Sequence, residues 1–206
     1  ALRGGDWATV RAVVDGTDPA TRTGLVRWAE AMDGARELAR RRVAEKPSDT
    51  LAGALLASCL IAEAWQVRSS LRARYVSREQ FDRFHEILRD AEQVLITAAA
   101  YDPGDCAVWT QRLITARGLE LGQSEARRRW DRLAEHDPHH LPGQVQMLQQ
   151  LCPKWGGSRA EMHEFARAAM LAAPPGAPNG MLVAQAHFEH LVDLEGDEPA
   201  AYRRDP

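Results

Sequence analysis

The stretch DPGDCAVWTQRLITARGLELGQSEARRRWDRLAEHDP, residues 102–138, decides the fold class. It begins and ends with Asp-Pro, a typical helix start. The Asp carboxylate can accept a hydrogen bond from an unpaired backbone N–H, and a proline at the first helical position has no N–H to lose. Between these signals, apolar residues recur at helical spacing, and Gly118 and Gly122 separate them into two segments. The stretch therefore predicts two helices, at about 103–120 and 123–136.

Similar signals occur along the rest of the chain. Asp18-Pro19 repeats the start signal, and Ser77 with Gln80 and Ser158 with Glu161 have capping-box spacing. No segment alternates polar and apolar residues long enough to form a strand. The sequence predicts an all-α fold with a possible break near Gly34, and the remaining helices fall at about 6–15, 19–45, 49–74, 78–101, 138–151, 158–172 and 178–194.

Prolines mark a repeat. Pro103, Pro138 and Pro174 lie 35 and 36 residues apart, close to the period of about 34 of a tetratricopeptide repeat, which has two helices and ends in a proline. Small and large apolar residues precede these prolines by 12, 8 and 5 positions: Ala91, Leu95 and Ala98; Ala126, Trp130 and Leu133; Ala166 and Ala169. The interval from Pro47 to Pro103 is longer, so the repeat is degenerate. We expect one domain over residues 1–206, a TPR-like stack of antiparallel helical hairpins forming an α-α superhelix.

Composition excludes several classes of protein. The chain has 206 residues, 45% of them hydrophobic and 27% charged, with a net charge of -3. This charge argues against a nucleic-acid binder. No run of about 18 apolar residues predicts a membrane span. The cysteines Cys59, Cys106 and Cys152 are odd in number and widely spaced, which indicates neither a disulfide framework nor a zinc site and favours a cytoplasmic location.

Several short motifs carry a family resemblance between about residues 5 and 189. They are Gly-Asp-Trp at 5–7, Ala-Trp at 64–65 with Arg68, Asp-Pro at 102–103 with Trp109, Arg117-Gly118, Lys-Trp-Gly-Gly-Ser at 154–158, Phe-Ala-Arg at 165–167, and Ala186-His187 with Glu189. With these motifs the chain resembles an uncharacterised bacterial family of tetratricopeptide-like proteins. The resemblance implies the helical-repeat fold and no particular reaction.

The most distinctive motif is Lys154-Trp155-Gly156-Gly157-Ser158. One interpretation is a tight turn between helices, with Trp155 packed in the core and Lys154 in solvent. The other is an anion or small-molecule site, in which the free N–H groups of the helix that Ser158 starts lie beside Lys154. In that alternative the chain is an enzyme or a sensor domain. The shape of the loop discriminates between them.

No pattern predicts catalysis, a cofactor or a metal ion. The sequence has no GxSxG motif and no thiol with a histidine partner. His136, His139 and His140 span a helix break, so we expect a solvated corner there. His187 and His190 share a helix face that His163 could join, and we expect surface and core-edge roles for them. The triplets Arg40-Arg41-Arg42 and Arg127-Arg128-Arg129 fan around a helix and should be solvated.

The function that this fold favours is non-catalytic binding of a protein or peptide in the groove of the stack, an inference by analogy with other helical repeats. We expect the tryptophans to lie mostly in the core, and Trp109 and Trp155 are the candidates for the groove. The expected partner-binding residues are Arg68, Trp109, Arg112, Lys154 and Trp155.

Overall fold

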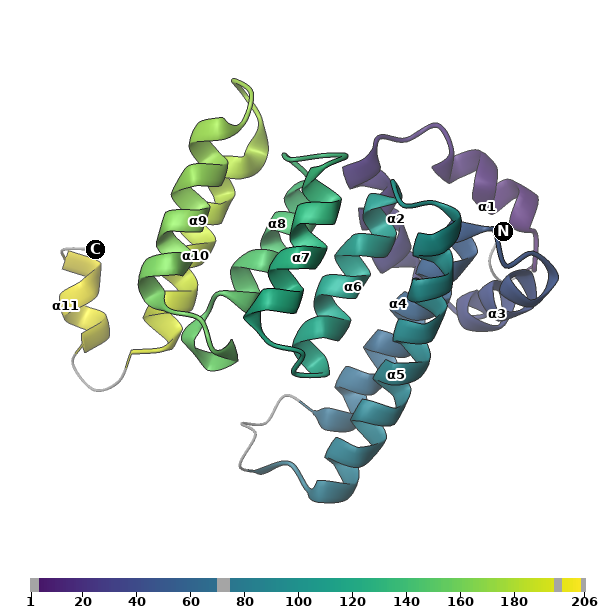
Figure 1. The fold of residues 1–206 in the computed structure, drawn as a ribbon, viewed down its shortest axis with the longest axis horizontal. Coiled ribbons are helices and arrows are strands. Elements are labelled where there is room, and N and C mark those ends of the chain that lie inside the picture. The colour runs from purple at the N-terminus through teal and green to yellow at the C-terminus, as the bar shows by residue number, and fades with distance from the viewer. Residues whose placement is uncertain (1–3, 70–74, 195–197, 205–206) are drawn as a thin grey trace.

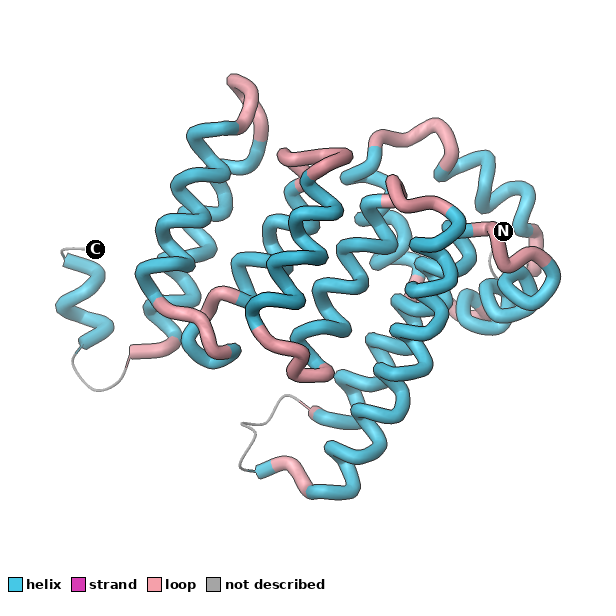
Figure 2. The backbone as a smooth tube through the Cα atoms, in the orientation of Figure 1, coloured by secondary structure: helices cyan, strands magenta, loops and turns pink. Residues whose placement is uncertain are grey.

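The computed structural model describes residues 4–69, 75–194 and 198–204. Within these residues the chain is helical, with no strand (Figure 2), which confirms the all-α prediction. The helices described in these ranges are α1 (Trp7–Val14), α2 (Pro19–Ala29), α3 (Ala35–Glu45), α4 (Thr50–Arg68), α5 (Arg78–Tyr101), α6 (Cys106–Gly118), α7 (Gln123–Ala134), α8 (Leu141–Gln150), the short 3-10 helix η2 (Pro153–Trp155), α9 (Arg159–Ala172), the short 3-10 helix η3 (Pro178–Gly180), α10 (Met181–Val192) and α11 (Glu198–Arg204).

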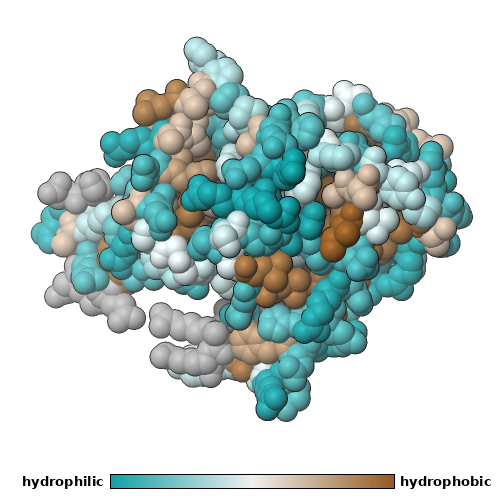
Figure 3. All heavy atoms as spheres, in the orientation of Figure 1, coloured by the Kyte–Doolittle hydropathy of each residue, from teal (hydrophilic) through white to brown (hydrophobic). Residues whose placement is uncertain are grey.

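The helices from α4 to α10 stand side by side in a row (Figure 1). The long helices α4 and α5 form an antiparallel hairpin that extends beyond the row, and α1 and α3 lie at the same end of the molecule. Helix α2 packs against α4, α6 and α8. Helices α7 and α8 follow α6, then α9 and α10, and α11 lies at the far end. Apolar residues on the face drawn in Figure 3 gather in separate patches among polar ones.

Two helices lie at the centre of the core. All 13 residues of α6 are buried, and α4 is buried along most of its length. Among the described residues, α4 alone is long and apolar enough to cross a membrane. The most apolar 18-residue part of α4 is 72% buried inside the molecule. A buried core helix can have the same length and composition as a membrane-spanning helix.

Several predicted boundaries are confirmed by capping geometry. Asp18 accepts a hydrogen bond from the Thr21 backbone N–H at 3.0 Å, and α2 begins at Pro19. Ser77 starts α5 with both hydrogen bonds of a capping box. The expected break near Gly34 separates α2 from α3, and Gly34 has a φ of 80°, a left-handed conformation that glycine adopts without strain.

Two predicted helix starts are wrong. Asp102-Pro103 forms a turn in which Asp102 accepts from the Gly104 N–H at 3.0 Å, and α6 begins only after Asp105, the next capping side chain. Asp137-Pro138 likewise forms a turn, and α8 begins at Leu141. The α8 start differs from that of α6, because His140 makes no side-chain cap and only Pro142 in the first turn marks the beginning of the helix. The expected helix at 49–74 is confirmed as far as Arg68, and residues 70–74 lie outside the described residues. Helix α11 was not predicted.

The repeat positions lie where the helices meet. Each of the spaced prolines follows the end of a helix, α5, α7 or α9. Seven of the eight residues selected by spacing are buried, and Trp130 is half-buried: Ala91, Leu95, Ala98, Ala126, Leu133, Ala166 and Ala169. Small residues at these positions allow the helices of a pair to approach closely.

Two expectations about burial are wrong. Trp28, one of the tryptophans expected in the core, is 68% exposed. Arg129 was expected in solvent, but its guanidinium is buried, bonded to Glu125 at 2.6 Å and to Glu92 at 2.9 Å. Arg129 is buried because three consecutive residues point in different directions around a helix, and in α7 the direction of Arg129 is toward the neighbouring helices.

Candidate functional site

A cavity of about 980 Å³ lies among α4, α5, α6, η2 and α10. One part of its wall is aromatic and another is charged. The lining residues are Trp65, Arg68, Phe81, Phe84, Arg117, Gly118, Glu120, Gly122, Gln149, Gln150, Lys154, Trp155, Gly156, Glu189, Val192 and Asp193. They come from segments far apart in the sequence, so only the packed fold creates this cavity.

Three of the five predicted partner-binding residues meet here. The Arg68 guanidinium lies over the rings of Trp65, at 5.7 Å, and Phe81, at 5.9 Å. Trp155 packs edge-on against Trp65, with ring centroids 6.0 Å apart. Lys154 is beside Trp155 and donates to Glu189 at 2.7 Å. The cavity is therefore the candidate functional site.

Trp109 and Arg112 do not line this cavity. Trp109 is 6% exposed, and its indole N–H donates to the Pro103 carbonyl at 2.7 Å. The expectation that Trp109 faces a groove is wrong, because α6 is surrounded by neighbouring helices. Arg112 is buried beside it and donates to the Glu92 carboxylate at 2.9 and 3.3 Å. Both side chains have their partners within the protein interior.

Arg117 is the unusual residue of the cavity wall. It is 8% exposed and donates to two oxygens of Gln146, the carbonyl at 3.1 Å and the side-chain amide at 2.8 Å. Its guanidinium lies 5.8 Å from the Trp155 ring centroid. Among the described residues no carboxylate forms an ion pair with it. Burial lowers the pKa of Arg117 to about 10, so the group is still a cation at neutral pH.

Among the described residues, the acidic residues of the wall form no direct ion pair with Arg117, although Glu189 favours its charge from a distance. Glu189 is bound by Lys154 and by the Gln149 amide. Asp193 is paired with Arg159 at 3.1 Å, and Glu120 is exposed. A buried cation without a paired anion is costly, because burial removes its hydration. An anionic ligand that entered the cavity would supply the missing partner.

The geometry of the 154–158 loop favours the turn interpretation. Gly156 has a φ of 83°, and a Cβ on Gly157 would lie 2.1 Å from the Leu151 carbonyl oxygen. Both glycines are therefore required by the bend. The N–H groups of Trp155, Gly156 and Gly157 bond to carbonyls of Cys152 and Pro153 within the turn. The loop has no open cradle of N–H groups for an anion, so the anion-binding groups must be side chains.

Ser158 also has a structural role. Its hydroxyl oxygen accepts from the Glu161 N–H at 3.2 Å, and the hydroxyl donates to the Glu161 carboxylate at 2.7 Å. This confirms Ser158 as the start of α9. Trp155, expected in the core by the turn interpretation, is half-buried in the cavity wall.

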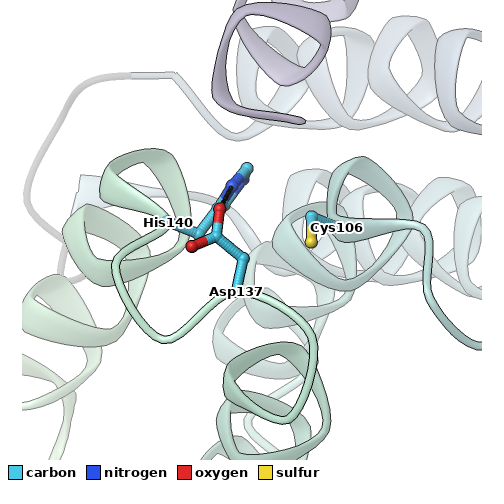
Figure 4. Close-up of side chains that lie close together, drawn as sticks. All are labelled: Cys106, Asp137 and His140. Carbon is cyan, nitrogen blue, oxygen red and sulfur yellow. Dashed lines mark hydrogen bonds and ion pairs between the residues drawn. The ribbon is translucent and has the colours of Figure 1, made fainter. Parts of the chain in front are cut away.

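One group of possible metal ligands is compact. Cys106, Asp137 and His140 have donor atoms that all lie within 4.8 Å of one another, and Figure 4 shows them where the start of α6 meets the turn before α8. Both His140 nitrogens have partners, Asp137 at 3.2 Å and the Thr23 hydroxyl at 3.1 Å. Burial and nearby carboxylates raise the pKa of the Cys106 thiol to about 11, so it is not a thiolate near neutral pH. We interpret this cluster as a structural contact between α2, α6 and α8.

The sequence named Arg117 only within the family resemblance and did not place it in a site. The available signal was the segment Cys106–Gly118, which has no polar face, so a charged residue within it must be buried. The contact with Gln146 and the ring of Trp155 depends on how α6 packs on α8 and η2, which spacing along the chain does not reveal.

Comparison of the chain with protein-family models, with curated proteins and with solved structures found no match. The family resemblance therefore stays a prediction from the sequence, and the case for function depends on the site.

Proposed function

We propose that this chain is a non-catalytic binding module that holds a segment of a partner protein in the cavity between α4, α5, α6 and α10. The observation that carries the proposal is Arg117, a buried cation in the cavity wall without a carboxylate partner among the described residues. A partner that presents an Asp or Glu side chain to Arg117 would form a charge-assisted hydrogen bond there.

The aromatic wall supplies the second half of the proposed interaction. Trp65, Phe84 and Trp155 lie together, with Trp65 and Phe84 ring centroids 4.9 Å apart. Aromatic side chains at interfaces contribute a large apolar area and commonly anchor a partner. The segment that fits both features has an acidic residue beside an apolar one. Arg68, Lys154 and Trp155 keep their proposed role as partner contacts.

The proposed architecture is a TPR-like stack of hairpins in which α6 with α7 and α8 with α9 are successive units. The burial of the repeat positions supports it, and so does the proline spacing. We propose a bacterial, cytoplasmic protein that acts by protein–protein interaction, without nucleic acid or membrane as its partner. The net charge of -3 and the buried thiols are consistent with this.

A second candidate is a small organic anion in the same cavity, in a sensor or an enzyme. The volume favours it, since about 980 Å³ lies at the upper end of the range of about 300–1,000 Å³ for small-molecule sites. Arg117 would bind the anionic group, and the aromatic rings would contact an apolar body.

An affinity experiment tests the main proposal. The wild-type protein and Arg117→Met would be used to recover partners from native lysate, and bound proteins would be quantified by mass spectrometry. Arg132→Met is the matched control, because Arg132 is exposed and pairs with the equally exposed Glu135, at 3.2 Å. We expect the partner to be recovered by wild type and control and to fall by about tenfold or more with Arg117→Met, the effect of losing a hydrogen bond to a charged group.

Two outcomes count against the partner-protein proposal. Equal recovery by all three proteins would exclude Arg117 as a contact. Recovery of no protein, together with a small acid bound to the wild type in native mass spectrometry and absent from Arg117→Met, would favour the second candidate.

A further inference from the structure

Three of the seven histidines lie together at the C-terminal end of the row of helices. His163 is on α9, and His187 and His190 are one turn apart on α10. His163 Nε2 lies 3.0 Å from His190 Nδ1, and the ring centroids of His163 and His187 are 4.8 Å apart. The packing of α9 on α10 thus brings an imidazole from one helix between two from the other.

Tyr202 of α11 completes the cluster. Its hydroxyl lies 2.6 Å from His187 Nδ1 and 3.5 Å from His163 Nε2. The Tyr202 ring also lies on His190, with ring centroids 4.2 Å apart. A hydroxyl can accept one hydrogen bond and donate another, so it links the two imidazoles.

A metal ion binds the neutral form of an imidazole. Burial, then His187, His190 and Arg167, lower the pKa of His163 below its usual value. Burial, then Arg159 and His187, lower that of His190, and Asp193 opposes them only in part. Neutral imidazole has a free lone pair, and a close pair of neutral imidazoles is the arrangement that a late transition metal ion recognises.

We propose that His163, His187 and His190 form a binding site for a divalent transition-metal ion such as Zn²⁺. This departs from the expectation that the sequence suggested for these histidines. With Zn–N bonds of about 2.0–2.1 Å and tetrahedral angles, two ligating nitrogens are about 3.3 Å apart. The 3.0 Å between His163 Nε2 and His190 Nδ1 is close to that separation. The ion would replace the hydrogen bond between them, with each imidazole proton on its other ring nitrogen.

His187 joins the site by a side-chain rotation. Its Nδ1 now faces Tyr202, so it turns away from the hydroxyl to reach the ion. His163, His187 and His190 are all partly exposed, so the rotation needs no repacking of the core and the ion can enter from solvent. A water molecule would complete the four ligands.

Titration calorimetry with Zn²⁺ alone, and separately with Ni²⁺ alone, tests the site on protein first dialysed against a chelator. We expect one equivalent to bind. His163→Gln and His190→Gln should each weaken binding by about 100-fold or more, because even the loss of a group that only supports a ligand costs about 10–100-fold. His187→Gln should weaken it by at least about tenfold. His136→Gln is the control, because His136 is exposed and lies far along the chain from the cluster.

Circular dichroism of each variant separates loss of ligands from loss of fold. The proposal is overturned if folded His163→Gln and His190→Gln proteins bind Zn²⁺ as tightly as wild type. It is also overturned if the wild type takes up neither ion. Equal effects of His136→Gln and His163→Gln would show adventitious surface binding and would equally exclude the site.

Discussion

Arg112 and Arg117 lie on the same buried helix, α6, and have nearly the same exposure, 9% and 8%. Their partners differ. Arg112 donates to the Glu92 carboxylate and belongs to a network with Arg129 and Thr115. Arg117 faces the cavity, and in the described part of the chain it donates only to the neutral Gln146.

The difference in partners distinguishes Arg112, whose charge stabilises the fold, from Arg117, whose charge is available to a ligand. Glu92 accepts hydrogen bonds from both Arg112 and Arg129, so the network is closed and offers nothing to a ligand. The Arg117 charge is stabilised by its hydrogen bonds to Gln146, by the Trp155 ring and by the more distant Glu189 carboxylate, with which it forms no ion pair. Burial therefore does not distinguish the two roles, and the identity of the partner does.

The largest expected effect on stability comes from removing the Glu92 charge that Arg112 and Arg129 share. Glu92→Gln leaves Arg112 and Arg129 buried without a full counter-charge, and should lower the free energy of unfolding by about 3–5 kcal/mol. Urea denaturation measures it. Glu86→Gln is the control, since the Glu86–Arg83 pair is exposed and should contribute under about 1 kcal/mol. Equal effects of the two substitutions would show that the network is not important for stability.

The ion pair of the partly buried Arg22 with the buried Asp105 allows the effect of a counter-charge to be followed by pH. Burial alone would raise the pKa of Asp105, but Arg22, at 2.7 Å, and the Thr50 hydroxyl outweigh it and lower the pKa below 3.8. This stabilisation is complete above the unfolded pKa of about 4 and is lost as pH falls through the lower folded value. Asp105→Asn should cost about 3 kcal/mol at pH 7, the lower end for breaking a buried pair.

The melting temperatures of the wild type and Asp105→Asn, measured between pH 7 and pH 2.5, test this sign. The gap between the two melting temperatures should narrow only below about pH 4, because there the Asp105 carboxylate of the unfolded wild type binds a proton while that of the folded wild type, with its lowered pKa, stays charged. A gap that stays constant down to pH 2.5 would contradict a lowered pKa for Asp105.

A smaller effect is expected at Arg117. Arg117→Met removes a desolvated charge, which stabilises, and loses the hydrogen bonds to Gln146, which destabilises, so stability should change by under about 1 kcal/mol. Arg112→Met should cost about 3 kcal/mol, because it removes one partner of a buried pair. Chemical denaturation of the two variants side by side sharpens the comparison. A large loss with Arg117→Met would mean that Arg117 is structural as well.

The smallest effect is expected at Lys154. Its side chain is 47% exposed and its pair with Glu189 is at the rim of the cavity. Lys154→Ala should change stability by under about 0.5 kcal/mol, as surface substitutions usually do. Thermal denaturation measures it, and a loss above about 1 kcal/mol would show that the pair holds α10 against the η2 turn.

Local signals predicted much of the fold. Asp18, Ser77, Ser158 and Gly34 each mark a helix boundary in the structure, because the groups that decide a cap lie within three residues of it. Asp102 misled because the capping side chain of Asp105 follows it. Asp137 misled because its side chain bonds within the turn, and α8 begins after His140, which makes no side-chain cap. The prediction of an all-α fold is confirmed, and a TPR-like superhelix stays a prediction.

The candidate site was predicted only in part. Lys154 and Trp155 were noticed because the glycines beside them mark an unusual turn, and Arg68 because of its place beside Trp65. Trp109 and Arg112 were placed in a groove, whereas the surrounding helices bury them. A residue type indicates what a side chain can bind, but not which neighbours it meets.

The sequence by itself determined the helices, most of their caps and the small residues at which the hairpins meet, because these depend on neighbours along the chain. Only the tertiary structure decided which buried charge has a counter-ion. Glu92 reaches Arg112 across 20 positions, Arg117 meets Trp155 from another helix, and His163 meets His190 across 27 positions. Those distances are fixed by the packing of helices, and electrostatic energy depends on the distance in space and not on the separation in sequence.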